Sequence, residues 1–396
     1  MSLIRFRLLA VVAILGVAIP ASAQPTTPLS DLATGTYLGF AGGLYENGSN
    51  EVPADHLAIG LARSDAIQPL DVSGNPSLGG KIVLLSIGMS NTTQEFCSAV
   101  GTTPCASWSF VGQALADAGV DHTALTLVNG ARGGKSASYW TSASSPEYAR
   151  IRDVDLANAG ATEAQVQAAW VKVANPEPTV SLPSAGADAY TLVAQMGSIV
   201  RALKTRYAHL RIVYFSSRIY AGYATTILNP EPYAYESALA VRWVLAAQIA
   251  QERGGPADAR AGDLDPAAGA PWLSWAAYPW ANGTTARSDG LVWLRSDLAA
   301  DGTHPSTSGQ TKVGAMLLAF WKGDPASRRW FRSWMHGDVD GSGSLDVSDV
   351  FFLIDRLFAG GPPVYGSGDA NGDGRLDVAD VFYLINHLFA GGPPPV

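Results

Sequence analysis

The sequence predicts an α/β fold in which a parallel β-sheet lies between two layers of helices, followed by a small α-helical unit at the C-terminal end. Two observations predict it. From about residue 80, short apolar runs alternate with amphipathic segments of helical length, as expected when each strand is followed by a crossover helix. Near the C-terminus, a segment with the spacing of a calcium-binding loop occurs twice, each time followed by an apolar helix.

The first 23 residues have the pattern of a secretory signal peptide. Arg5 and Arg7 precede the apolar run 8–20, and Ala21-Ser22-Ala23 offers a cleavage site before Gln24. The run is too short for a spanning helix, although an uncleaved membrane anchor is the alternative. No other stretch is long and apolar enough to cross a bilayer, so we expect a secreted protein, either free or attached to the cell surface.

The composition is ordinary for a folded chain with a full hydrophobic core, since 47% of the residues are hydrophobic and 15% are charged. We divide the chain into the signal peptide (1–23), a catalytic domain (24–334) and a calcium-loop domain (335–396). The formal net charge of −8 is concentrated in the last 59 residues, where nine Asp stand against two Arg. No basic patch suited to nucleic acid is present.

Two cysteines, Cys97 and Cys105, lie eight residues apart in the expected catalytic domain. In an exported chain this spacing predicts a local disulfide. A free buried pair is the alternative, whereas two isolated cysteines are a poor metal site.

Four strands are expected in the catalytic domain. They cover residues 81–87, 123–131, 166–175 and 211–220, with helices over 107–119, 187–210 and 233–254. This order implies right-handed crossovers and a sheet covered on both faces. Ligands of such sheets bind beyond the carboxyl ends of the strands. Since each expected strand ends in a polar or glycine-rich turn, candidate site residues should gather at one edge.

The first of these turns, Gly88-Met89-Ser90-Asn91, places a serine directly after a buried strand. A serine nucleophile needs a histidine base and an acid that orients the base. Among the six histidines, His304 is the best candidate, because Asp301 three residues earlier can reach the imidazole within one turn. Taken alone, this Asp-x-x-His pattern is common, and a surface histidine in a loop is the alternative.

Together these segments resemble the SGNH (GDSL-like) hydrolase family over about residues 80–320, in four blocks that follow the family's order. The second block is "VNGARGGKSASYW" (128–140), and the third ends the third strand on Asn175. The resemblance implies a flavodoxin-like three-layer α/β/α fold and a serine esterase that uses Ser90, His304 and Asp301 without a cofactor. It also implies an oxyanion hole that includes the Gly134 N–H and the Asn175 side-chain amide. Met89 departs from the family, which usually has Asp or Gln at this position.

Two further residues are expected to contact substrate. Arg218 follows the fourth strand and can hold an acidic or hydroxylated group, with a salt bridge to Glu231 or Glu236 as the alternative. Trp280 belongs to an indole-rich stretch before the His304 loop, which suits stacking on sugars, with packing under a long loop as the alternative. The expected substrates are acyl or acetyl esters, on carbohydrate. Lipase or lysophospholipase activity and an inactive surface or carbohydrate-binding protein are the alternatives.

An internal repeat with a period of 31 residues accounts for the acidic C-terminus. Oxygen-bearing residues fall at loop positions 1, 3, 5, 9 and 12, a spacing that surrounds Ca²⁺ with hard ligands, and the carbonyl at position 7 adds another. The expected ligands are Asp338, Asp340, Ser342, Ser344, Asp346 and Asp349 in the first loop, and Asp369, Asn371, Asp373, Arg375, Asp377 and Asp380 in the second. Helices should follow over 350–358 and 381–389, and two structural Ca²⁺ ions should supply part of the folding energy.

The repeated region resembles a type I dockerin domain over about residues 337–396. The resemblance implies a cohesin-like protein partner. The Ser/Thr pair that usually opens the recognition helix is replaced by Val347-Ser348 and Val378-Ala379. A cell-surface or intramolecular role therefore stays open.

Overall fold

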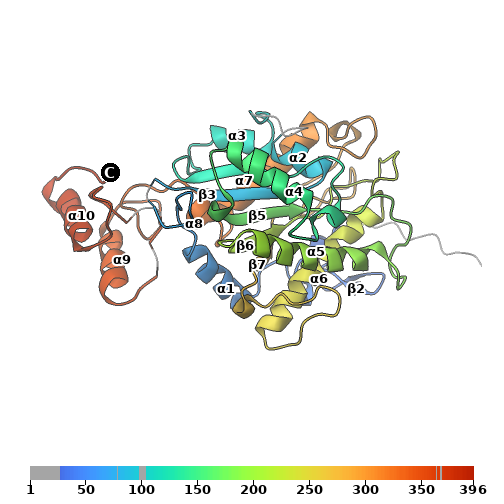
Figure 1. The fold of residues 1–396 in the computed structure, drawn as a ribbon, viewed down its shortest axis with the longest axis horizontal. Coiled ribbons are helices and arrows are strands. Elements are labelled where there is room, and N and C mark those ends of the chain that lie inside the picture. The colour runs from blue at the N-terminus through green and yellow to red at the C-terminus, as the bar shows by residue number, and fades with distance from the viewer. Residues whose placement is uncertain (1–26, 78, 98–103, 363, 366–367) are drawn as a thin grey trace, which may run out of the picture.

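The computed structural model describes residues 27–77, 79–97, 104–362, 364–365 and 368–396, and its centre is a five-stranded parallel sheet (Figure 1). The strands are β1 (Thr36–Tyr37), β2 (Phe40–Ala41), β3 (Ile82–Gly88), β4 (Leu125–Asn129), β5 (Val166–Lys172), β6 (Ile212–Phe215) and β7 (Trp272–Trp275). The α-helices are α1 (Ala54–Asp65), α2 (Ser90–Phe96), α3 (Phe110–Ala116), α4 (Pro146–Arg150), α5 (Asp188–Arg206), α6 (Tyr233–Glu252), α7 (Thr307–Gly323), α8 (Arg328–Phe331), α9 (Val347–Phe358) and α10 (Val378–Ala390). None of these described helices is both long and apolar enough to span a bilayer. The signal peptide predicted over 1–23 lies outside the described residues.

The sheet has the strand order β4-β3-β5-β6-β7 and separates two hydrophobic cores, which confirms the predicted three-layer arrangement. Along β3, Val83 and Leu85 enter the core that contains α5 and α6, whereas Ile82 and Leu84 enter the core that contains α3 and α7. Successive strand residues point to opposite faces. A strand covered on both faces therefore needs a continuous apolar run, and all seven residues of β3 are buried.

The four predicted strands are present as β3, β4, β5 and β6, and every pairing between them is parallel. The fifth strand, β7, lies in a stretch that the sequence pattern does not predict as a strand. It has only four residues, Trp-Leu-Ser-Trp, and its indoles suggest loop packing instead. The structure shows that β7 pairs with β6 and that all four of its residues are buried.

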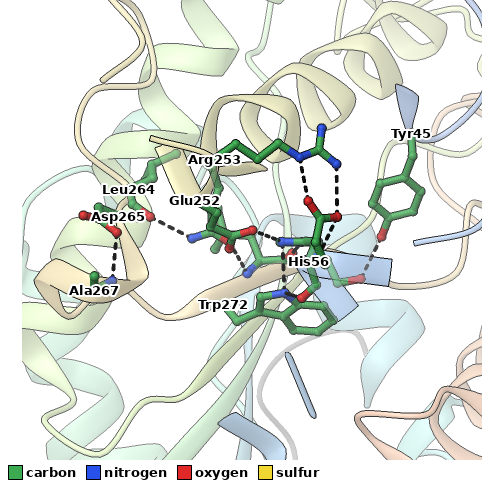
Figure 2. Close-up of polar contacts among 12 residues, drawn as sticks. Tyr45, His56, Glu252, Arg253, Leu264, Asp265, Ala267 and Trp272 are labelled. Atoms are coloured by element: carbon green, nitrogen blue, oxygen red, sulfur yellow. Dashed lines mark hydrogen bonds and ion pairs between the residues drawn. The ribbon is translucent and has the colours of Figure 1, made fainter. Parts of the chain in front are cut away.

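Tyr45 and His56, which precede the first sheet strand in the chain, lie beside β7 (Figure 2), a role that the sequence leaves open. His56 on α1 is fully buried, and its Nδ1 lies 2.6 Å from the Glu252 carboxylate at the end of α6. The Nε2 atom lies 2.8 Å from the Leu273 carbonyl oxygen on β7. Since both ring nitrogens face acceptors, His56 links three elements structurally.

Two more side chains contact the backbone of β7. The Tyr45 hydroxyl accepts from the Trp275 N–H at 3.3 Å and lies 2.8 Å from Ser274 Oγ. Gln248 on α6 accepts from the Leu273 N–H at 2.7 Å. The N-terminal segment and α6 thus hold β7 in place through hydrogen bonds. The bond between Tyr45 and Ser274 joins residues more than 200 positions apart in the sequence.

The C-terminal helices α9 and α10 form a lobe beside the α/β body (Figure 1). Its small hydrophobic cluster has matching members from the two repeats, namely Val339 and Ala370, Val350 and Val381, and Leu353 and Leu384. Both helices begin three residues earlier than the sequence predicts. The reason is that Asp346 and Asp377 cap them, since each carboxylate accepts a backbone N–H two residues later.

Glu236 on α6 should make the stability of the protein depend on pH. Its carboxyl is 1% exposed and accepts hydrogen bonds from the Leu182 N–H (3.0 Å) and the Tyr37 hydroxyl (3.3 Å). Burial raises the pKa of Glu236 to about 7. The folded state therefore binds this proton more tightly than the unfolded state, and stability is lost as pH rises from about 4 through 7.

We expect the free energy of unfolding of Glu236→Gln, which imitates the neutral carboxyl, to rise relative to that of the wild type as the pH increases. From pH 5 to pH 8 the difference between the two proteins should grow by about 2 to 3 kcal/mol. Urea unfolding at a series of pH values measures this difference. Glu177→Gln, on an exposed loop, is the control and should follow the wild type. Parallel pH profiles for Glu236→Gln and the wild type would contradict the interpretation.

Candidate active site

The turn after β3 is built on a close approach of two strand ends. Gly88, the last residue of β3, pairs with Lys172, the last residue of β5. A Cβ atom at Gly88 would lie 2.2 Å from the Lys172 carbonyl oxygen and 2.4 Å from Thr92 Oγ1. Glycine is therefore required, and the chain enters α2 with Ser90 as its first helical residue.

Thr92 stabilises this turn. Its hydroxyl donates to the Lys172 carbonyl oxygen at 2.6 Å and accepts from the Met89 N–H at 3.2 Å. The backbone of residue 89 is thus held without a polar side chain at that position. No sequence pattern singles out Thr92, because its partners come from two different elements.

The structure brings together the three residues expected to act in catalysis. Ser90 Oγ lies 2.7 Å from His304 Nε2, and His304 Nδ1 lies 2.5 Å from Asp301 Oδ2. Ser90 comes from the start of α2, whereas Asp301 and His304 belong to the loop before α7. These distances are those of hydrogen bonds that connect a hydroxyl, an imidazole and a carboxylate in series.

Asp301 is held in its ionised form. Burial opposes ionisation, but hydrogen bonds from the His304 ring and from the N–H groups of Thr303 and His304 outweigh it, so the pKa of Asp301 is lowered. The ionised carboxylate fixes the proton of His304 on Nδ1. The lone pair of Nε2 then faces the Ser90 hydroxyl.

The Asp301–His304 loop is anchored from both sides. The Asn91 side chain, next to Ser90, donates to the Thr303 carbonyl oxygen at 3.1 Å. On the other side, the Thr225 N–H donates to the Asp301 carbonyl oxygen at 2.9 Å. Gly302 lies between them with φ +65°, and a Cβ there would lie 1.9 Å from a backbone oxygen of the 221–226 segment. The sequence alone indicates no role for Asn91, although Asn91 directly follows Ser90 in the turn after β3.

The segment Gly133-Gly134, which contains one of the two residues expected in an oxyanion hole, lies near Ser90. Gly133 comes close, since a Cβ there would be 3.9 Å from Ser90 Cβ, while a Cβ at Gly134 would meet no atom within 4 Å. The φ of Gly134 is +77°, a conformation that favours glycine. The Asn175 amide donates one proton to Asp188 at 2.9 Å. An amide has two N–H donors, so the second stays available for a ligand.

Trp280 and Arg218 are expected from the sequence to contact substrate, but the structure buries both side chains. Trp280 is fully buried, and its indole N–H donates to the Glu231 carboxylate at 2.8 Å, so it cannot stack on a sugar. Arg218 is 2% exposed, which does not fit contact with an external substrate. Its alternative, a salt bridge to Glu231 or Glu236, is not formed among the described residues either. The commoner explanation of indole-rich segments, packing inside the protein, applies here.

Cys97 and Cys105 form a disulfide in the structure, as the sequence predicts. Cys97 directly follows α2, the helix that begins with Ser90. The bond closes a loop of which residues 98–103 are not described. It ties down the far end of a helix of only seven residues, which tertiary contacts must hold because short helices are marginal alone.

The first acidic loop gathers carboxylates that could hold a metal ion. Oxygen atoms of Asp338, Asp340 and Asp349 all lie within 4.8 Å of one another. Burial, with the nearby Asp340 charge, raises the pKa of Asp338 and of Asp349. A divalent cation would relieve the repulsion between these groups, and oxygen donors of this kind suit Ca²⁺.

The second loop has the same hydrogen-bond pattern as the first. Asp369 accepts from the N–H groups of Asp373 (3.0 Å) and Gly374 (2.7 Å), as Asp338 accepts from those of Ser342 (3.0 Å) and Gly343 (2.9 Å). The carboxylates at position 12, Asp349 and Asp380, both accept from the N–H at loop position 2. The two loops therefore share one backbone conformation. Ion binding stays a prediction for all twelve expected ligands, including Ser342, Ser344, Asp346, Asn371, Asp373, Arg375 and Asp377, which the carboxylate cluster does not contain.

Comparisons with known proteins find no matching family model and no matching curated protein. Among solved structures, an extracellular lipase from Streptomyces rimosus is 13% identical, with 60% of this chain and 99% of that chain covered and a TM-score of 0.32. A GDSL-like lipase from Bacteroides thetaiotaomicron is 11% identical (69% and 98% covered, TM-score 0.33). A family two carbohydrate esterase from Clostridium thermocellum is 14% identical (61% and 63% covered, TM-score 0.33). Similarity at this level says nothing about the activity of this chain.

We expect Gly88→Ala to destabilise the protein by about 2 to 3 kcal/mol, because the added methyl group overlaps the Lys172 carbonyl oxygen. Urea unfolding measures the loss. Gly323→Ala at the end of α7 is the matched control, since a Cβ there meets no atom within 4 Å. Equal stability of the two variants would show that the strand ends are not packed as described.

Proposed function

We propose that this protein is a serine hydrolase that cleaves carboxylic esters. The observation that supports it is the continuous series of contacts from Ser90 Oγ to His304 Nε2 (2.7 Å) and from His304 Nδ1 to Asp301 Oδ2 (2.5 Å). An acid that orients a base, and a base that contacts a hydroxyl, are the groups that acyl transfer through a serine needs.

In this mechanism His304 acts first as base and then as acid. As Ser90 Oγ bonds to the ester carbonyl carbon, the hydroxyl proton moves to Nε2, and the imidazolium is stabilised by Asp301. The tetrahedral intermediate then expels the alcohol, which takes the proton from Nε2. Water attacks the acyl-enzyme with His304 again as base, which releases the acid and restores the Ser90 hydroxyl.

Charge on the carbonyl oxygen would be stabilised by backbone N–H groups and a side-chain amide. The proposed donors are the N–H groups of Ser90 and Gly134 and the second amide proton of Asn175. Ser90 lies at the N-terminal end of α2, where backbone N–H groups have no partner within the helix. Each such donor typically lowers the barrier by about 3 kcal/mol.

We further propose a secreted enzyme that acts on acyl or acetyl esters of carbohydrate. The signal-peptide pattern over 1–23 and the attached acidic repeat support this proposal. Trp280 does not support it, because its buried side chain offers no platform for a sugar. A lipase or lysophospholipase with the same three residues would prefer long acyl chains. A carbohydrate-binding or surface protein without activity would show no turnover at all.

Ser90→Ala should lower ester hydrolysis at least about 1,000-fold and abolish labelling by a fluorophosphonate probe, because no other hydroxyl among the described residues contacts His304. Labelling is followed by intact-mass spectrometry. Turnover is measured on acetylated xylan, short acyl esters and lysophospholipid. Ser138→Ala, on the exposed segment after Gly134, is the control and should keep both activities. Folded wild-type protein that takes up no label would contradict the proposal.

For the C-terminal lobe we propose two Ca²⁺ ions with a structural role. The three clustered carboxylates of the first loop and the identical backbone pattern of the second support it. The ions would be held by the positions named for each loop, with Asp349 and Asp380 at position 12. Bound cations would stabilise a lobe whose own hydrophobic cluster has few buried members.

The partner proposed for this lobe is a cohesin-like protein or a component of the cell surface. Each helix carries large apolar side chains that stay open to solvent at matching positions. Phe351 and Phe382 are 65 and 64% exposed, and Phe358 and Phe389 are 68 and 67% exposed. Exposed apolar groups on a repeated surface favour an interaction with another protein.

Chelation of Ca²⁺ by EDTA should unfold the lobe and leave ester hydrolysis largely unchanged, because Ser90, His304 and Asp301 lie in the α/β body. Calorimetric titration should find two Ca²⁺ sites in the wild type and one in Asp349→Ala. Asp355→Asn, on α9 outside the loop, is the control with two sites. Loss of activity in parallel with loss of Ca²⁺ would contradict the separation.

A further inference from the structure

The first acidic loop of the C-terminal lobe is covered by an aromatic side chain, Tyr365. The Tyr365 N–H donates to the Val339 carbonyl oxygen at 3.0 Å. The ring lies over Gly341, where an added Cβ would be 2.7 Å from the Tyr365 Cγ atom. Tyr365 therefore contacts the backbone of the loop at positions 2 and 4.

The second loop is covered in the same way by Val396, 31 residues after Tyr365, which is the period of the repeat. The Val396 N–H donates to the Ala370 carbonyl oxygen at 3.3 Å, and a Cβ at Gly372 would lie 2.7 Å from Val396 Cγ2. The two repeats thus use the same position for the same contact. They differ in the side chain that occupies it, and only the tyrosine has a ring.

The Tyr365 ring also contacts the α/β body. The guanidinium carbon of Arg329 lies 4.7 Å from the ring centroid, and the Trp334 ring lies 5.1 Å away at an angle of 62°. Arg329 belongs to α8, at the end of the body next to the lobe (Figure 1), and forms an ion pair with Asp65 on α1. The Trp334 indole N–H donates to the Arg329 carbonyl oxygen at 3.2 Å. Tyr365 therefore joins the first loop to side chains that are fixed to the body.

The backbone that Tyr365 contacts is also the backbone that positions the expected Ca²⁺ ligands. Asp338 and Asp340 lie on either side of Val339, and the Val339 N–H donates to Asp349 Oδ1 at 2.8 Å. The three carboxylates lie within 4.8 Å of one another and repel each other when no cation is bound. A bound cation removes this repulsion and thereby fixes the surface on which the Tyr365 ring lies.

We propose that Tyr365 docks the first loop on the α/β body, so that Ca²⁺ binding in this loop and docking of the lobe stabilise each other. This inference rests on the Ca²⁺ sites proposed for the lobe. The coupling is reciprocal, because an ion that favours docking must bind more tightly to the docked lobe. The second loop, covered by Val396, should bind Ca²⁺ independently of the body.

Docking through Tyr365 leaves the apolar surface of the lobe open to a partner. The side chains of Phe351, Phe358, Phe382 and Phe389 stay exposed while the Tyr365 ring contacts the body. Filling of the first site would therefore hold this surface in one orientation relative to the α/β body.

The test is calorimetric titration of the full chain with Ca²⁺. Tyr365→Val gives the first loop the residue of the second and should weaken one of the two sites about 5- to 20-fold, as expected for the loss of an aromatic pair and a cation–π contact. Tyr365→Phe keeps the ring and should bind both ions as the wild type does.

Trp334→Ala separates docking from a role of Tyr365 inside the lobe, because Trp334 lies outside both loops. It should weaken the same single site about 3- to 10-fold. Trp108→Ala, at an exposed indole elsewhere on the body, is the control and should leave both sites unchanged. If Trp334→Ala does not fold, Arg329→Gln replaces it with the same expected result. Its control is Asp65→Asn, which breaks the Arg329 ion pair but keeps the guanidinium.

Small-angle X-ray scattering at saturating Ca²⁺ measures docking directly. The largest dimension of the wild type should be smaller than that of Tyr365→Val, whose lobe is no longer held. Unchanged Ca²⁺ affinity in Trp334→Ala, whether or not Tyr365→Val weakens a site, would overturn the inference. Wild-type protein that binds no Ca²⁺ would instead refute the proposed ion sites themselves.

Discussion

The hydrogen bond between Ser90 Oγ and His304 Nε2 depends on the whole α/β body, because it joins residues 214 positions apart in the sequence. It requires the end of β3 and the loop before α7 to meet at one place. The parallel sheet provides the first position, since Gly88 packs directly against the end of β5. Packing of α7 on α2 and α3 provides the second. Loss of either arrangement would separate the two side chains while leaving each local structure intact.

The sequence predicts the fold well where periodic patterns are long. Alternation of apolar runs and helical segments identifies β3 to β6, because strands covered on both faces consist mostly of apolar residues. Contact among Ser90, His304 and Asp301 is also predicted by two features of the sequence. Carboxyl ends of parallel strands share one edge, and three residues of separation bring Asp301 to its histidine.

Prediction fails where the outcome depends on contacts between distant elements. β7 is too short for its four residues to show a period, and only its pairing with β6 identifies it. Trp280 lies in a stretch rich in indoles, yet its burial depends on Glu231 and on the packing of α6, which local sequence does not encode. Thr92 and Asn91 are anchors for the same reason, since their partners are Lys172 and Thr303. A motif names residues, but their surroundings come from the rest of the chain.

The contacts that Tyr45, His56 and α6 make with β7 have a consequence for association between molecules. β7 is the outermost strand on its side of the sheet, and outermost strands present free N–H and C=O groups that can pair with another chain. Here the Leu273 N–H, the Leu273 carbonyl and the Trp275 N–H are already taken by Gln248, His56 and Tyr45. Side chains thus occupy the positions that an incoming strand would need, and they protect the sheet from edge-to-edge aggregation.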